Sequence, residues 1–185
     1  MFIQTEQTPN PATLKFLPGR DVVTKGVVDF VDADKAQASP LARRVFEVEG
    51  VTGVFLGSDF VTVTKAAGED WYALKPAVLG AIMEHFMSGD PVLEPGGEPA
   101  DDGVPGEEED ELAKQIRELI DTRVRPAVAQ DGGDIIFRGF ERGIVYLHMR
   151  GACSGCPSSS ITLKNGIENL LRYYVPEVVE VRQVA

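Results

Sequence analysis

The sequence predicts an α+β protein of two small domains joined by an acidic linker. Three observations support this. Short β-rich runs alternate with helical apolar patterns in both halves of the 185-residue chain. Hydrophobic residues make up 43% of the chain, enough for a buried core. Residues 90–110 are rich in Pro, Gly and acid, a composition that cannot bury enough surface to offset ordering. We therefore expect domains at 1–89 and 111–185 and a solvated flexible spacer at 90–110.

The first domain is expected to place helices on a small sheet. Ser39 followed by Pro40 is typical of a helix start. Asp70 is expected to cap a second helix that ends at Gly89. The strands are expected at 2–6, 13–17, 51–56 and 60–64. The core face of the second helix is expected to carry Trp71, Leu74, Val78, Ile82 and Phe86.

The second domain is expected in the order α-β-β-α-β. Its first helix carries an apolar stripe of Leu112, Ile116, Leu119, Ile120 and Val124, and is expected to end at 130–134. Two β-rich runs, 135–140 and 144–150, flank Glu141-Arg142-Gly143 and predict a hairpin. A helix that begins at Pro157 and is stopped by Pro176, followed by a strand at 178–184, completes the domain.

Charge and hydropathy exclude several function classes. The formal net charge of −11 divides into −3 for residues 1–89, −10 for 90–111 and +2 for 112–185. A balance of +2 is too small to indicate nucleic-acid binding. No apolar run approaches the roughly 20 residues that a membrane span needs. The N-terminus lacks the features of a signal peptide. We expect a cytoplasmic protein, or a mitochondrial-matrix one if a transit peptide was removed.

The two cysteines are the strongest chemical signal. Cys153 and Cys156 form a C-x-x-C pair between a predicted strand and a predicted helix. With Pro157 at the first helical position, Cys156 lies at or next to the N-cap, where the helix dipole favours thiolate. We therefore expect lowered cysteine pKa values. In a metal-free chain we expect this loop to be mobile and exposed.

The pair leaves three interpretations: a metal site, a thiol–disulfide redox pair, or an inert buried pair. Ser-Gly between the thiols disfavours the inert pair, and no strand-helix-strand unit precedes the cysteines as a thioredoxin-type protein would require. Iron–sulfur clusters and structural zinc usually take four protein ligands. One chain supplies two sulfurs, so the simplest closed site lies on a two-fold axis between two chains. Glutathione could instead supply the missing ligands.

Three stretches resemble one family. The signature at 151–159, continuing through 162–168, is similar to the NifU-like C-terminal domain of the Nfu family, as is the stretch 125–134. The start, 2–16, resembles the Nfu N-terminal domain. The acidic linker is the part least like the family.

The resemblance implies a non-enzymatic iron–sulfur scaffold or carrier. It implies a [4Fe–4S] cluster bridging a homodimer, with Cys153 and Cys156 as ligands, and a [2Fe–2S] cluster stays an alternative. Upstream cluster-assembly proteins would supply the cluster and apo iron–sulfur proteins would receive it. The N-terminal domain would aid recipient recognition or stability. A zinc-bridged adaptor and a redox protein remain the rival functions, and no membrane or nucleic-acid partner is expected.

Other polar residues are expected to be structural. His148 is expected to be a half-exposed strand residue, and His85 a surface or boundary residue of its helix. Asp131-Gly132-Gly133-Asp134 is expected to be a helix C-cap and turn rather than a cation site. We also hypothesise that Gly132 and Gly133 let the backbone approach the cysteine loop.

Overall fold

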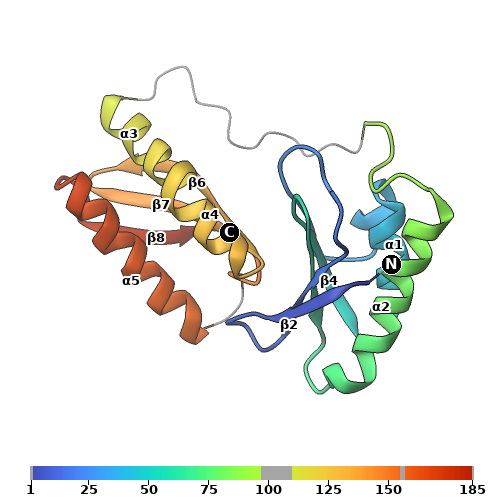
Figure 1. Cartoon of the computed structure of the whole chain (residues 1–185). Coiled ribbons are helices and arrows are strands. Elements are labelled where there is room, and N and C mark those ends of the chain that lie inside the picture. Colours follow the sequence, from blue (N-terminus) through green and yellow to red (C-terminus); the bar gives the residue numbers. More distant parts are fainter. Residues whose placement is uncertain (1, 97–109, 155–156, 185) are drawn as a thin grey trace. The chain divides into compact units, whose positions relative to one another are not determined.

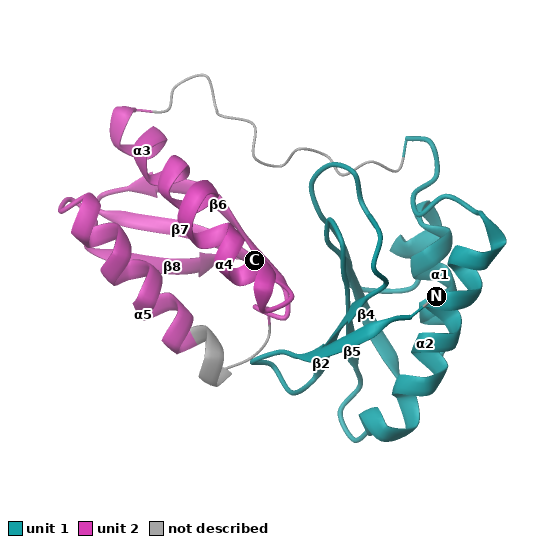
Figure 2. Cartoon of the chain, viewed as in Figure 1, with its two compact units in different colours: residues 1–100 teal, residues 101–185 magenta. Residues whose placement is uncertain are grey.

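The computed structural model describes residues 2–96, 110–154 and 157–184, and of residues 157–160 it describes only the backbone. The chain divides into two compact units, residues 1–100 and 101–185 (Figure 2). Each unit has its own β-sheet and its own hydrophobic core. The predicted α+β class is therefore confirmed.

The first unit is built on an antiparallel sheet with strand order β1-β2-β5-β4-β3 (Figure 1). The strands are β1 (Gln4–Gln7), β2 (Thr13–Leu17), β3 (Val28–Phe30), β4 (Val51–Leu56) and β5 (Val61–Lys65). The predicted strands are present, with boundary shifts of up to two residues. The edge strand β3 was not predicted.

The two α-helices of the first unit begin at the predicted capping residues, and α2 ends at the predicted Gly89, whereas the short 3₁₀ helix and the end of α1 were not predicted. They are a short 3₁₀ helix η1 (Lys35–Ala38), α1 (Pro40–Phe46) and α2 (Trp71–Ser88). The Ser39 side chain accepts a hydrogen bond from the Ala42 N–H, and that of Asp70 accepts one from the Tyr72 N–H. Gly89 ends α2 in the left-handed region, at a φ of 79° that glycine adopts without strain.

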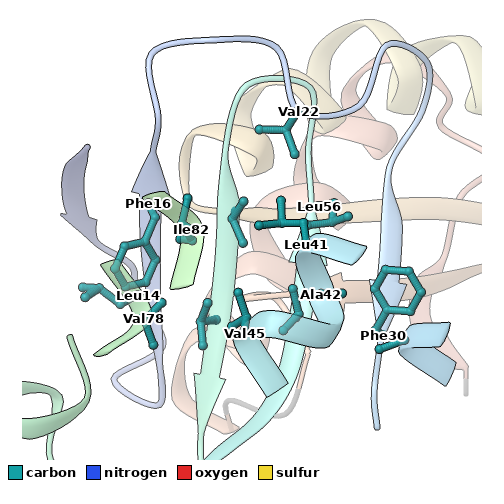
Figure 3. Packing of buried hydrophobic residues seen from close by; sticks show 14 of the residues in the cluster. Leu14, Phe16, Val22, Phe30, Leu41, Ala42, Val45, Leu56, Val78 and Ile82 are labelled. Carbon is teal, nitrogen blue, oxygen red and sulfur yellow. The ribbon is translucent and has the colours of Figure 1, made fainter. Parts of the chain in front are cut away.

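The core of the first unit lies between the sheet and the two α-helices (Figure 3). Leu41 and Val45 of α1 and Val78 and Ile82 of α2 are fully buried there, and Phe16 enters from the sheet. On α2, the predicted apolar residues are buried or partly buried against this core. The amphipathic pattern therefore identified the inner face of the helix.

His85 is fully buried, so the expectation of a surface or boundary position is wrong. It lies 11 residues after Leu74 and three after Ile82, which places all three side chains on the inner face of α2. Neither ring nitrogen has a hydrogen-bond partner within the described chain. Burial and the nearby Arg44 charge lower the His85 pKa, while Asp90 acts in the opposite direction. The buried imidazole is thereby held neutral.

The chain continues along the first unit after α2. The Ser39 hydroxyl donates to the Val92 carbonyl at 2.6 Å, and the Glu94 N–H donates to the Ala38 carbonyl at 2.8 Å. Arg44 also forms an ion pair with Asp90 at 3.1 Å. Residues 90–94 of the segment expected to be a spacer thus contact the first unit, and most of the rest of that segment lies outside the described residues.

The second unit has a three-stranded sheet with strand order β6-β7-β8. Strands β6 (Gly133–Glu141) and β7 (Ile144–Gly151) form the predicted hairpin, and β8 (Glu180–Val184) pairs parallel to β7. Arg142 and Gly143 adopt positive φ values of 53° and 79° in the connecting turn. This matches the right-handed twist of a tight hairpin.

The first helical region of the second unit consists of three consecutive segments. They are α3 (Glu111–Leu119), a π-helical segment η2 (Ile120–Val124) and α4 (Arg125–Gln130). The second helical region is α5 (Pro157–Tyr174). Ile116, Ile120 and Val124 are buried against the sheet core, as the stripe predicted. Across the described ranges, no helix has both the length and the apolar character required to cross a bilayer.

Candidate functional site

The candidate site lies where β7 leads into α5. Cys153 lies two residues after Gly151, the last residue of β7, and the Ser154 N–H donates to the Gly151 carbonyl at 3.1 Å. Pro157 is the first residue of α5, as predicted. The predicted ligand Cys156 lies outside the described residues. The structure therefore places Cys153, the first of the two candidate ligands, together with β7 before the pair and α5 after it.

Cys153 is buried rather than exposed. Only 6% of its surface is accessible, and its side chain belongs to the core of the second unit. The expectation of an exposed cysteine loop is therefore wrong for this residue. A thiol is small and weakly polar, so it packs as an apolar group when no metal holds it.

Gly133 explains how Cys153 fits into the core. The two strand ends pair through Gly133 and Gly151, and the Ala152 N–H donates to the Gly132 carbonyl at 3.2 Å. A β-carbon on Gly133 would lie 2.4 Å from the Cys153 sulfur and 3.0 Å from the Cys153 nitrogen. No side chain larger than hydrogen fits without movement. The hypothesis of close backbone approach thus holds geometrically at Gly133.

The thiol of Cys153 is held in its protonated form. Burial raises its pKa to about 12, and the nearby Asp131 and Asp134 carboxylates act in the same direction. The sequence-based expectation of a lowered pKa is therefore wrong for Cys153. Cys153 lies four residues before the start of α5, and the helix dipole acts mainly within the first turn. Desolvation is therefore the larger effect.

An ion pair near Cys153 joins α4 to β6. Arg125 Nε lies 2.9 Å from Asp134 Oδ1, and Arg125 Nη2 lies 3.0 Å from Oδ2. Asp134 is nearly inaccessible to solvent, so this bidentate pair supplies hydrogen bonds that water cannot. The pairing raises the Arg125 pKa. Sequence reasoning missed this pair, because no periodic pattern relates a helix residue to a strand residue nine positions later.

The remaining polar candidates behave as structural residues. The Asp131 N–H donates to the Val128 carbonyl, and Gly132 adopts a φ of 79°, so these two residues form the predicted C-cap and turn, whereas Gly133 and Asp134 already belong to β6. His148 is half-buried, with Nδ1 3.3 Å from the Val184 carbonyl oxygen. Within the described residues, no group of three or more His, Cys, Asp or Glu side chains could hold a metal ion.

These features define a class of protein: two α+β units, the second with a C-x-x-C pair between a strand and a helix. The chain belongs to the Nfu family. Residues 3–89 match the family model "Scaffold protein Nfu/NifU N terminal", and residues 116–182 match "NifU-like domain". Together the two matches cover both units, each within one unit.

Relatives with similar sequences are named as iron–sulfur cluster scaffold homologues. Proteins of Drosophila erecta and Drosophila sechellia, each named "NFU1 iron-sulfur cluster scaffold homolog, mitochondrial", are 54% identical to this chain over 185 residues. A Drosophila ananassae protein of the same name is 52% identical. The match covers 100% of this chain but 65% of the first two relatives, so the chain spans about two thirds of their length.

Two solved structures are similar to single parts of the chain. A NifU-like protein from Saccharomyces cerevisiae is 26% identical, with a TM-score of 0.46, over 50% of this chain and 84% of that one. A Staphylococcus aureus protein is 26% identical, with a TM-score of 0.40, over 44% of this chain and 98% of that one.

Proposed function

We propose that this chain is an iron–sulfur cluster carrier: two copies bind one [4Fe–4S] cluster through Cys153 and Cys156 of each and pass it to apo-proteins. One observation carries the proposal. The only two cysteines of the chain stand three positions apart at the strand-to-helix junction of a NifU-like domain. The names of the relatives, which specify a cluster scaffold, support the same role.

Ligand number supports a shared site. Four thiolates complete the coordination of a cubane cluster, and one chain has two cysteines. Two copies related by a two-fold axis supply four sulfurs without any further residue. A cluster at such a seam would be released when the two chains separate, which suits delivery better than permanent electron transfer.

The burial of Cys153 bears on the rival functions. A cysteine that attacks a disulfide or a substrate requires an accessible thiolate, whereas Cys153 is buried beside Gly133. A metal removes the proton from a thiol that coordinates it. The arrangement therefore disfavours Cys153 as the attacking thiolate of a thiol–disulfide enzyme.

The proposed partners follow from the cargo. Upstream cluster-assembly proteins would load the dimer, and apo iron–sulfur proteins would receive the cluster. The compartment would be a bacterial-type cytoplasm or the mitochondrial matrix, the second in keeping with the mitochondrial relatives. The first unit would help to recognise recipients or would stabilise the chain.

A transfer assay tests the proposal. The chain is loaded anaerobically with iron and sulfide, repurified and mixed with an apo enzyme that needs a [4Fe–4S] cluster. We expect recovery of enzyme activity that tracks loss of cluster from the carrier. Cys153→Ser and Cys156→Ser chains, treated identically, control for free iron and sulfide. A cluster that stays on the carrier while the enzyme stays inactive would refute the carrier role. One zinc per dimer without sulfide would favour the adaptor instead.

A further inference from the structure

The outer face of α2 is apolar from one end to the other, although the inner face already forms the core. Tyr72 is 90% exposed and Met87 is 77% exposed, and Met83 is also exposed. The other exposed apolar positions of the helix are Ala73, Pro76, Ala77 and Gly80. Glu84 is the only exposed charged residue of α2. A helix that is apolar all round is normally covered on both sides.

The large residues of this outer face lie along one line of the helix. Tyr72, Pro76, Met83 and Met87 fall within about 60° of one another at 100° per residue. They span roughly 22 Å, at a rise of 1.5 Å per residue. Single exposed apolar side chains are normal, whereas a continuous line of this length indicates an interaction surface.

Gly80 lies near the centre of the line and has no role inside its own unit. Its φ is not in the left-handed region, and a β-carbon built on it would meet nothing within 4 Å. Glycine in an exposed helix interior makes the helix less stable than alanine does. A close approach by another backbone, which only a missing side chain permits, would account for this residue.

We propose that the outer face of α2 packs against the same face of a second copy of this chain, as an antiparallel helix pair crossing at Gly80. The residue spacing is self-complementary in this orientation. A two-fold axis between positions 79 and 80 sets Tyr72 opposite the second copy's Met87, and Pro76 opposite its Met83. Thioether and aromatic groups make favourable contacts.

The charges of α2 permit this pairing. Glu84 is the one exposed charge of α2, and its Oε1 lies 3.1 Å from Nη1 of Arg44, which also pairs with Asp90. Each copy therefore brings one exposed carboxylate near the contact, and an arginine of the same chain already holds that carboxylate. The exposed residues of this face are apolar apart from that carboxylate, so an apolar partner fits it better than a charged one.

The size of the contact indicates when it forms. A strip 22 Å long and about 10 Å wide on each helix buries roughly 500 Å² in total. Stable interfaces bury at least about 1,200 Å². The helix pair is therefore weak by itself and forms when two chains are already joined, because linked units face each other at millimolar effective concentration. The strength of the helix contact thus rests on the proposed cluster-bridged dimer. The pairing of residues in the contact does not depend on that dimer.

Site-specific photocrosslinking of the full chain tests the proposal. Benzoylphenylalanine replaces Met83, and isotopically light and heavy chains are mixed so that contacts between copies are identified by mass. We expect mixed cross-links from position 83 to the neighbourhood of Pro76, with a yield at least fivefold higher after cluster loading. Iron and sulfide are measured on the same samples.

Two glycine variants sharpen the test. Gly80→Arg has space within its own unit and better helix propensity, so it should keep the melting temperature and reduce the cross-link yield at least fivefold. Gly166→Arg changes a glycine of α5 that also has open space, and should leave the yield unchanged. An unchanged yield in Gly80→Arg would overturn the proposal, as would absent or scattered cross-links in a loaded dimer. If no cluster forms, the proposed function fails, but the helix contact is still tested. In that case the cross-linking is repeated with the unloaded chain at millimolar concentration, and the same cross-link yields support or overturn the contact.

Discussion

Gly133 and Cys153 lie in direct contact, so that a β-carbon on Gly133 would overlap the Cys153 sulfur. The glycine therefore fixes where the first candidate ligand lies. Gly133→Val should shift the cysteine, destabilise the second unit by about 1–3 kcal/mol and lower cluster loading. Urea unfolding and iron analysis measure the two effects.

Gly139→Val is the matched control, because Gly139 lies on the same strand and a β-carbon there meets nothing within 4 Å. It should change stability by no more than about 0.5 kcal/mol and leave loading intact. Equal loading by the two valine variants would show that the Gly133 contact does not position the ligand.

The Arg125–Asp134 pair should be sensitive to geometry as well as charge. Arg125→Leu leaves the buried Asp134 carboxylate without its bidentate partner and should destabilise the second unit by about 2 kcal/mol. Arg125→Lys keeps the charge but loses the planar double contact, so the stability of this variant should lie between those of the parent chain and Arg125→Leu. A double-mutant cycle with Asp134→Leu isolates the coupling, and additive effects would contradict a direct pair.

The burial of Cys153 predicts slow chemical modification. In the metal-free folded chain, iodoacetamide should alkylate Cys153 at least tenfold more slowly than in urea, since the sulfur is packed in the core. Peptide mass spectrometry resolves the rate at this residue. Gly133→Val should accelerate the reaction by displacing the sulfur. Equal rates in folded and unfolded chains would show that Cys153 is accessible in solution.

His85 predicts a pH dependence of the first unit. Burial and Arg44 lower its pKa in the folded chain, whereas the unfolded chain titrates near 6.5. Below that value the unfolded state gains a proton that the folded state does not bind, so stability is full above about pH 6.5 and falls as the pH decreases towards the folded pKa. Thermal unfolding between pH 7.5 and 5.5 measures this loss.

His85→Leu removes both the titrating group and the two buried nitrogens without partners. This variant should unfold at a higher temperature than the parent chain at pH 5.5, and its melting temperature should change less between the two pH values. A steeper pH dependence in this variant would refute the assignment to His85.

The sequence predicts the parts of the fold that are encoded locally. Ser39, Asp70 and Gly89 mark helix ends because their own side chains or φ values make the cap. Arg142 and Gly143 mark the hairpin for the same reason. The position of the cysteines between β7 and α5 also follows from local pattern.

Other features depend on distant contacts or on competing effects. The three-residue strand β3 is too short to show alternation, and only its pairing with β4 defines it. The π segment precedes Pro126, which cannot donate to the helix ladder and crowds the preceding turn. The raised pKa of Cys153 was unexpected, because the loop sequence shows the helix start but not the burial beside Gly133.

Native mass spectrometry of the anaerobically loaded chain tests the central claim most directly, because it counts chains, irons and sulfides in one particle. The account predicts a species of two chains with about four irons and four sulfides, which is absent when Cys153→Ser or Cys156→Ser replaces the parent chain. A complete cluster on a single chain, or a loaded dimer that persists without these cysteines, would contradict it.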